Sequence, residues 1–262
     1  MQRPQWIASG AAVLLLLLLY FGCQTKTPEH QQLEAVRQPE AAGESLLRAA
    51  REALTPAQLA DISTLEDRLE SRTEEDNEID LLQQLSGTYY RAGRPEAAGY
   101  YARQLAEVEN TEEAWSIAGT TFSLCTQKYL GSEEEDGIRQ QCAQEAVAAY
   151  EAAISLNPNE LDHRVNLALI YVDNPPEGNP MKGILDLVGL DKEYPREPRV
   201  LVALGRLAVR TGQWERAEQR LSVADEIEPD FPGLACLLAQ TYQQLGQADK
   251  EQTYAARCNP PQ

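Results

Sequence analysis

The feature that most constrains the fold of this chain is a helical pattern that repeats every 34 residues in its C-terminal part. Positions one repeat apart carry equivalent residues, namely Leu204 and Leu238, Gly205 and Ala239, and Gly212 and Gly246. From Glu44 onward the strong apolar patterns have the spacing of α-helices. A period of this length predicts a helix hairpin that is copied along the chain, with neighbouring hairpins sharing one core.

The repeat resembles the tetratricopeptide family, in which small residues lie where paired helices touch and Pro follows the second helix. The unit near 198–231 matches that pattern at Leu201, Leu204, Gly205, Gly212, Ala217, Leu221, Ala224 and Pro229. An earlier unit matches at Trp115, Gly119, Phe122, Ala146, Tyr150, Ala153 and Pro158. The other units match at fewer positions, among them Leu82, Tyr89, Gly93, Leu167, Ala168, Tyr171 and Tyr242.

The resemblance implies an all-α fold, a right-handed superhelical α-solenoid of helix hairpins over residues 78–258. Its units are expected near 79–111, 112–160, 161–197, 198–231 and 232–258. A separate helical segment is expected at 44–77, because Thr55, Pro56 and Gln58 have the pattern of a helix start with a capping box. Side chains that match the family pattern are expected to form the core.

Residues 1–23 are an apolar segment that predicts membrane attachment by an N-terminal helix. Its apolar part, Trp6–Gly22, has about 17 residues and would span roughly 25 Å as a helix, at the short end of a membrane span. Arg3 precedes this part, while the residues after it hold one Lys26 and then turn acidic, so the positive-inside rule places the body of the protein outside the cytoplasm. Residues 24–43, with prolines among polar residues, are expected to form a flexible tether.

Three interpretations of this segment compete. An uncleaved signal anchor, as in a single-pass inner-membrane protein with a periplasmic repeat domain, agrees with its length and is favoured. A bacterial lipoprotein signal agrees with Gly22-Cys23, in which case Cys23 carries lipid and the protein lies at the outer membrane, although Tyr20 stands where that motif usually has Leu. A cleaved secretory signal fits worst, because no small-x-small site follows the Leu run.

Composition argues against several classes of function. Asp and Glu number 41 against 23 Lys and Arg, and the net charge of −18 argues against coating nucleic acid. The acidity also fits a salt-adapted proteome, since net charge governs solubility and not fold. With two His and no phosphate loop, H-E-x-x-H or G-x-S-x-G motif, the sequence indicates no catalytic, cofactor or metal site, so we expect a protein that is not an enzyme.

Two segments depart from the repeat. About 15 extra residues lie between Phe122 and Ala146 and include the acidic run Ser132–Asp136. This run lacks the alternating oxygen ligands and the glycine of a calcium loop, so a solvated loop is favoured. Residues 174–183 form a long turn with three prolines, which is a candidate contact surface, although an inert turn is the simpler interpretation.

Four of the five cysteines lie in the repeat region. Cys125 lies near the end of one helix and Cys142 near the start of its antiparallel partner, so a disulfide there would clamp the mouth of the insertion, with a gain of about 3 kcal/mol. Cys236 and Cys258 lie at similar heights on the last hairpin, but their faces match less clearly. An extracytoplasmic location permits both disulfides. Buried free thiols are the alternative.

Tetratricopeptide arrays bind extended peptides or helices in a groove lined by the first helix of each pair, and the resemblance implies the same here. The implied groove positions are Tyr90, Arg91, Thr120, Val165, Leu169, Arg199, Val202, Arg206, Arg210, Gln240 and Gln244. The three Arg of the fourth unit would hold an acidic segment or a C-terminal carboxylate of a partner through charge-assisted hydrogen bonds. Pairing with the protein's own acids is the alternative.

We therefore expect a membrane-anchored scaffold for protein–protein interactions on the extracytoplasmic side, with envelope protein assembly as its setting. One alternative is an outer-membrane lipoprotein with a related task. A second is a non-catalytic accessory subunit of a membrane enzyme complex, as in cytochrome c maturation machinery, which rests on analogy of fold alone. A third is an array that mainly self-associates.

Overall fold

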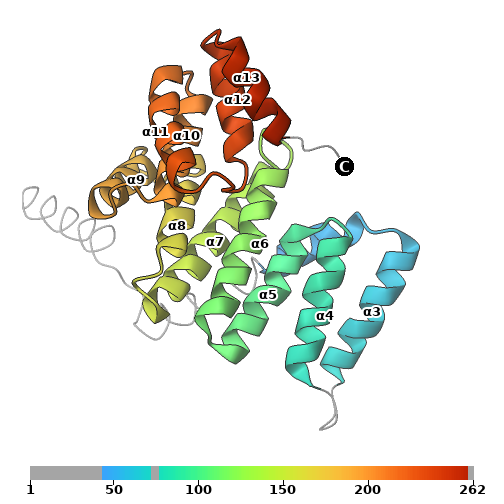
Figure 1. The fold of residues 1–262 in the computed structure, drawn as a ribbon. Helices are drawn as coiled ribbons and strands as arrows, with labels where there is room; N and C mark the ends of the chain where they lie inside the picture. The colour runs from blue at the N-terminus through green and yellow to red at the C-terminus, as the bar shows by residue number, and fades with distance from the viewer. Residues whose placement is uncertain (1–42, 72–76, 259–262) are drawn as a thin grey trace, which may run out of the picture. The chain divides into compact units, whose positions relative to one another are not determined.

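The structure is a computed structural model that describes residues 43–71 and 77–258. Within these ranges all regular secondary structure is α-helical, which confirms the predicted all-α class (Figure 1). The predicted membrane segment 1–23 and residues 24–42 of the predicted tether lie outside these ranges. In the described ranges no helix combines the length and the apolar character that a membrane crossing requires.

The chain divides into two compact units, Met1–Ser45 and Leu46–Gln262, and the helices from α3 onward belong to the second. A helix at residues 43–52 comes before them. The others are α3 (Pro56–Glu70), α4 (Glu78–Arg91), α5 (Pro95–Glu109), α6 (Glu112–Lys128), α7 (Asp136–Leu156), α8 (Leu161–Asp173), α9 (Lys182–Glu193), α10 (Pro198–Arg210), α11 (Trp214–Ile227), α12 (Leu234–Gln244) and α13 (Ala248–Cys258).

From α3 to α13 each helix packs against the next one along the chain (Figure 1). The pairs α4–α5, α6–α7, α8–α9, α10–α11 and α12–α13 each fall in one of the five units expected from the sequence. The first helices α6, α8, α10 and α12 also contact one another in succession, so that neighbouring pairs are joined through their first helices.

Local sequence sets the ends of these helices. Thr55 caps α3 with the predicted capping box, in which Thr55 N–H donates to Gln58 Oε1 at 3.0 Å and Gln58 N–H donates to Thr55 Oγ1 at 3.3 Å. Gly212 and Gly246 lie between the two helices of their pairs with φ of 68° and 70°, a conformation that favours glycine. The residue after each glycine donates its N–H to the carbonyl five residues earlier, at 2.8 and 2.9 Å, which ends the first helix.

Small residues let the helices of a pair approach closely. A Cβ at Gly119 would lie 2.8 Å from the ring of Tyr150, and a Cβ at Gly205 would overlap the side chain of Leu221. Tyr150 and Leu221 are 1% and 0% exposed, so these contacts belong to the core.

The helix α3 is fixed to the first pair by a polar cluster. Glu66 Oε1 accepts hydrogen bonds from the hydroxyls of Tyr89 at 3.1 Å and Tyr101 at 2.7 Å. Arg51 pairs with the other oxygen of the same carboxylate. Burial, followed by the nearby carboxylate of Glu66, raises the pKa of both tyrosines, which keeps their hydroxyls protonated as donors.

Candidate binding surfaces

The groove positions expected from the sequence separate into exposed and covered residues. Tyr90 is 56% exposed. The other positions at the surface are Arg91, Thr120, Arg206, Arg210, Gln240 and Gln244, and the half-buried ones are Leu169 and Arg199.

Two of the expected groove residues belong to the core instead. Val165 and Val202 are each 2% exposed. Val165 packs with Leu187 of α9, and Val202 belongs to the cluster that contains Leu234 and Leu238 of α12. The neighbouring helices cover both valines, so neither can contact a partner.

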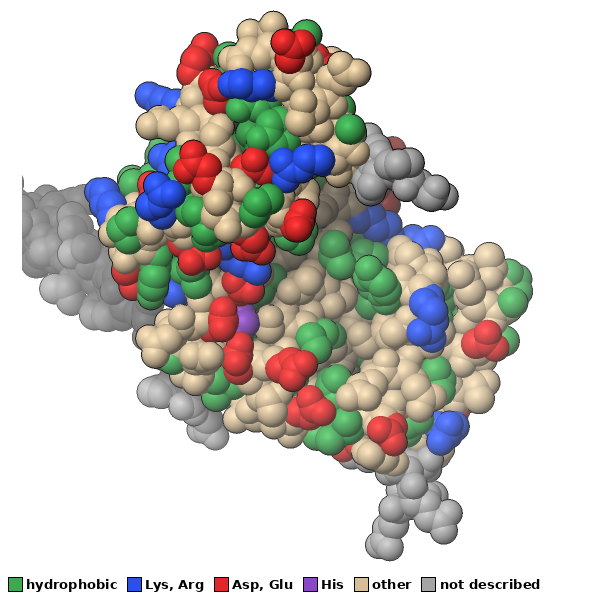
Figure 2. Space-filling view, viewed as in Figure 1, with side chains coloured by type: hydrophobic (Ala, Val, Ile, Leu, Met, Phe, Trp, Pro, Cys, Tyr) green, Lys and Arg blue, Asp and Glu red, His purple; other side chains and the backbone are tan. Residues whose placement is uncertain are grey.

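The three Arg of α10 have different environments. The sequence left open whether they bind a partner's carboxylate or pair with the protein's own acids, and for two of them the structure shows pairing. Arg199 pairs with Asp162, and Arg210 Nη1 lies 2.5 Å from Asp173 Oδ1. Both pairs join α8 to α10, so these guanidinium groups are matched by the protein's own acids. Arg206 is exposed and has no ion pair within the described residues. On the face drawn in Figure 2 acidic and basic side chains are interspersed, in keeping with such pairs.

The helix α6 exposes apolar side chains that the groove prediction did not include. Ile117 is 50% exposed and Leu124 is 36% exposed. They are seven residues apart, which places them on the same side of the helix, with exposed Thr120 between them. The opposite side of α6 carries buried Ala118 and Phe122. Apolar residues on two sides of one helix, where a surface helix usually has one apolar side, are the sequence signal that would have identified this surface.

Beneath this surface the side chains of α6 are held by the second helix and by α8. The Tyr150 hydroxyl lies 3.3 Å from Thr120 Oγ1 and 3.2 Å from Ser123 Oγ. His163 of α8 is 3% exposed and its Nε2 contacts the carboxylate of Glu112. The hydrogen bond with His163 lowers the pKa of Glu112. These contacts fix α6 as a rigid element.

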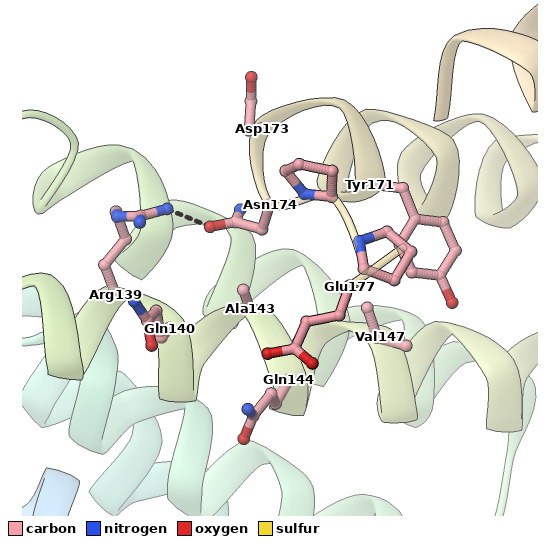
Figure 3. A pocket seen from close by; sticks show the side chains of 11 residues that line it. Arg139, Gln140, Ala143, Gln144, Val147, Tyr171, Asp173, Asn174 and Glu177 are labelled. Atoms are coloured by element: carbon pink, nitrogen blue, oxygen red, sulfur yellow. Dashed lines mark hydrogen bonds between the residues drawn. The ribbon is translucent and has the colours of Figure 1, made fainter. Parts of the chain in front are cut away.

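The two segments that depart from the repeat meet beside α7. A cavity of about 640 Å³ lies between α7 and the turn at 174–181 (Figure 3). A second cavity of about 590 Å³ adjoins it at the connection 129–135. Arg139 and Asp173 line both cavities. Arg139 Nε donates to Asp136 Oδ1 at 2.9 Å, and its Nη1 donates to Asn174 Oδ1 (Figure 3). Arg139 therefore links the insertion to the proline-rich turn.

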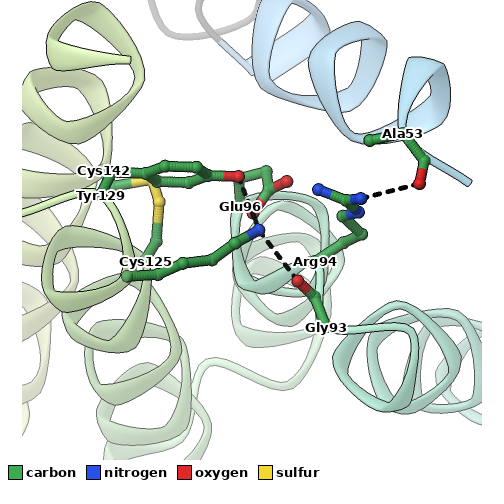
Figure 4. A network of polar contacts seen from close by, with 8 residues as sticks. Ala53, Gly93, Arg94, Glu96, Cys125, Tyr129 and Cys142 are labelled. Carbon is green, nitrogen blue, oxygen red and sulfur yellow. Dashed lines mark hydrogen bonds and ion pairs between the residues drawn. A yellow bond between two sulfur atoms is a disulfide. The ribbon is translucent and has the colours of Figure 1, made fainter. Parts of the chain in front are cut away.

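A polar network around the buried side chains of Glu96 and Tyr129 holds the insertion against the α4–α5 pair. Lys128 Nζ lies 2.9 Å from Gly93 O, 2.7 Å from the Tyr129 hydroxyl and 3.5 Å from Glu96 Oε2 (Figure 4). Glu96 is 0% exposed. Burial lowers the pKa of Lys128. Burial, followed by the nearby carboxylate of Glu96, raises the pKa of Tyr129. The network fixes the point at which the insertion leaves α6.

The predicted disulfide between Cys125 and Cys142 is confirmed. Figure 4 shows this disulfide, whose Cα atoms are 6.0 Å apart. Both cysteines are fully buried, in a cluster that also contains Phe122 and Tyr150. The disulfide closes the base of the insertion, as expected from the antiparallel placement of the two helices.

The disulfide between Cys236 and Cys258 is also confirmed, with Cα atoms 4.7 Å apart. It joins α12 to the end of α13, a helix that has no buried residue. The other links of α13 lie near the surface. Tyr254 Oη donates to Asp225 Oδ2 at 2.7 Å, and Arg257 Nη2 donates to Asp225 Oδ1 at 2.9 Å.

Comparisons with known proteins give no family assignment. No protein-family model matches the chain, and a search of curated proteins finds no match. In the described part of the chain no group of three or more His, Cys, Asp or Glu side chains is arranged to hold a metal ion. The function is therefore argued from the surfaces described above.

Proposed function

We propose that this chain is a membrane-anchored scaffold that binds segments of other proteins along the exposed faces of its first helices. In this proposal the helix pairs are tetratricopeptide units wound into a right-handed superhelix. The segment 1–23 holds them on the extracytoplasmic side, and envelope assembly is the setting. The order of helix contacts, the glycine turns and the small residues between paired helices support the repeat assignment.

The observation that carries the proposal is the apolar surface of α6. Ile117 and Leu124 expose large apolar side chains on one side of α6, where their contact with water is unfavourable. Both side chains are already at least half buried, so covering the exposed remainder against a partner would contribute about 0.5–1.5 kcal/mol each. Thr120 between them, together with Arg206 on α10, supplies polar groups that set the orientation of a bound segment.

The two disulfides support the proposed side of the membrane. Disulfides form and persist in the periplasm and outside the cell, whereas thiols in the cytosol are kept reduced. Cys125–Cys142 and Cys236–Cys258 both have Cα separations in the usual range for this bond.

The binding surface is tested by co-purification from native membranes. The amount of partner protein that co-purifies should fall about tenfold or more in the Ile117→Ser/Leu124→Ser variant. Each Ser removes apolar area that would be buried at the interface. The matched control is Val108→Ser/Ile227→Ser, which changes side chains of similar exposure, 47% and 42%, on second helices. Equal retention by both variants, or equal loss from both, would contradict a specific first-helix surface.

The anchor is tested by the intact mass of the protein purified from its own membranes. A start at Met1 supports a signal anchor and an inner-membrane location. A start at Cys23 with added acyl mass supports a lipoprotein and moves the location to the outer membrane. A start after Cys23, without lipid, would contradict membrane attachment through this segment.

A further inference from the structure

The cavity beside α7 combines an apolar floor with acidic groups at its edge. Ala143 and Val147 of α7 and Pro175 and Pro176 of the turn supply apolar lining, while Glu177 contributes a carboxylate (Figure 3). Its volume of about 640 Å³ is large enough to accept a long side chain with part of its backbone.

The charged groups around the cavity leave an excess of negative charge. The Arg139 guanidinium is occupied by Asp136 and Asn174, with its Nη2 2.5 Å from Asp136 Oδ1. Arg210 pairs with Asp173, which lines both cavities.

Two further carboxylates in this region have no such match. Glu177 lines the first cavity and Glu133 the second, and neither forms an ion pair with a described residue. An anion would therefore meet repulsion here, while a cation would be attracted.

One polar group of the lining also lacks a partner. The Nδ2 of Asn174 is buried and has no hydrogen-bond acceptor, although the Oδ1 of the same amide accepts from Arg139. A buried donor without an acceptor is costly.

We propose that this cavity binds an arginine side chain that a partner protein presents on an extended segment. The aliphatic stem of the arginine lies on the apolar floor and its guanidinium donates to the Glu177 carboxylate. The cavity shares no residue with the α6 surface, so this proposal does not depend on the proposed function.

The proposal is tested with fluorescein-labelled glycine-serine peptides that carry one central arginine, citrulline or glutamate, titrated with the full chain in detergent. Citrulline keeps the shape of arginine without the charge. The arginine peptide should bind about tenfold more tightly than the citrulline peptide by fluorescence anisotropy, and the glutamate peptide more weakly still. The binding of the arginine peptide should weaken as salt is added.

Matched charge reversals separate local recognition from the attraction of any cation to a chain of net charge −18. Glu177→Lys should weaken the binding of the arginine peptide about tenfold or more. Glu228→Lys makes the same change in net charge at an exposed residue outside the cavity lining, and should leave binding within about twofold. Gln144→Trp, which places a bulky ring at the exposed edge of the cavity, should also weaken binding without a change in charge.

Three results would overturn the proposal. They are equal affinity for the arginine and citrulline peptides, equal weakening by Glu177→Lys and Glu228→Lys, and no anisotropy change with the arginine peptide up to about 1 mM. Circular dichroism of each variant confirms that the helical fold is intact before binding is compared.

Discussion

The α6–α7 and α12–α13 pairs are each closed by a disulfide, but they differ in what else holds their helices together. In α6–α7 the cysteines lie in a core with Phe122 and Tyr150, each 1% exposed. In α12–α13 the second helix has no buried residue, and Cys258 joins it to α12 at its end. One disulfide therefore lies inside a packed core, and the other joins the end of a helix without fully buried residues to α12.

This difference follows from the number of helices that cover each pair. The helices α6 and α7 pack against α5 and α8 as well as against each other, whereas α13 packs against α12. No described helix follows α13 to cover its outer face, and its sequence is correspondingly polar. We infer that the stability of α13 is local and depends on a few named links, while that of α6–α7 is shared with the rest of the array.

The largest effect should come from the core of the α6–α7 pair. Phe122→Ala should lower the free energy of unfolding by about 3–5 kcal/mol, because it removes a fully buried ring and leaves a cavity. Tyr254→Ala in α13 should cost about 1–2 kcal/mol, because its half-buried ring stacks on Tyr242 and its hydroxyl donates one hydrogen bond to Asp225. Urea unfolding of both variants, followed by circular dichroism, tests this; similar losses would remove the contrast between the two pairs.

Removal of each disulfide in turn should show the difference between the two helix pairs most clearly. The Cys236→Ser/Cys258→Ser protein should lose about 3 kcal/mol of local stability, since the disulfide closes a loop between residues 22 apart in sequence. Its α13 amides should then exchange rapidly with deuterium. In the Cys125→Ala/Cys142→Ala protein the α6 and α7 amides should stay protected under native conditions, because packing still holds both helices. Full protection of α13 in the first variant would show that its other links suffice.

A smaller effect should appear in alkaline solution, at α13. Burial, and then the hydrogen bond to Asp225, raises the pKa of Tyr254 from 10.0 to about 12. The folded state therefore keeps a proton that the unfolded state loses, so α13 should become less stable as the pH rises from 10 to 12. Hydrogen exchange of α13 at several pH values measures this change. Tyr254→Phe should have a lower starting stability and lack this pH dependence; the same dependence in both proteins would assign it to another group.

Much of the fold could be predicted because the repeat acts through local rules. Gly212 and Gly246 mark the turns through their backbone conformation, and Thr55 marks a helix start through its side-chain cap. The disulfide of Cys125 with Cys142 follows from two antiparallel helices joined by an insertion. Each of these features depends on residues of one hairpin, so the sequence of that hairpin contains the information.

The candidate surfaces were less predictable because they depend on how separate pairs pack. Val165 and Val202 occupy first-helix positions but are covered by neighbouring helices, and the extent of that cover is set by the stacking of pairs. The contact between Arg139 and Asn174 joins residues 35 apart in sequence, one in the first turns of α7 and one at the start of the turn after α8. No periodic pattern relates such segments, so their meeting beside α7 appears only in three dimensions.

The most direct test of the proposed scaffold is site-specific photo-crosslinking in intact cells. A photoreactive residue is placed at Thr120, between Ile117 and Leu124 on α6, and in a second protein at Val108 on α5. The account predicts that Thr120 forms discrete adducts with other proteins and that Val108 does not. An absence of adducts at Thr120, or the same adducts from both positions, would contradict a binding surface on the first helices.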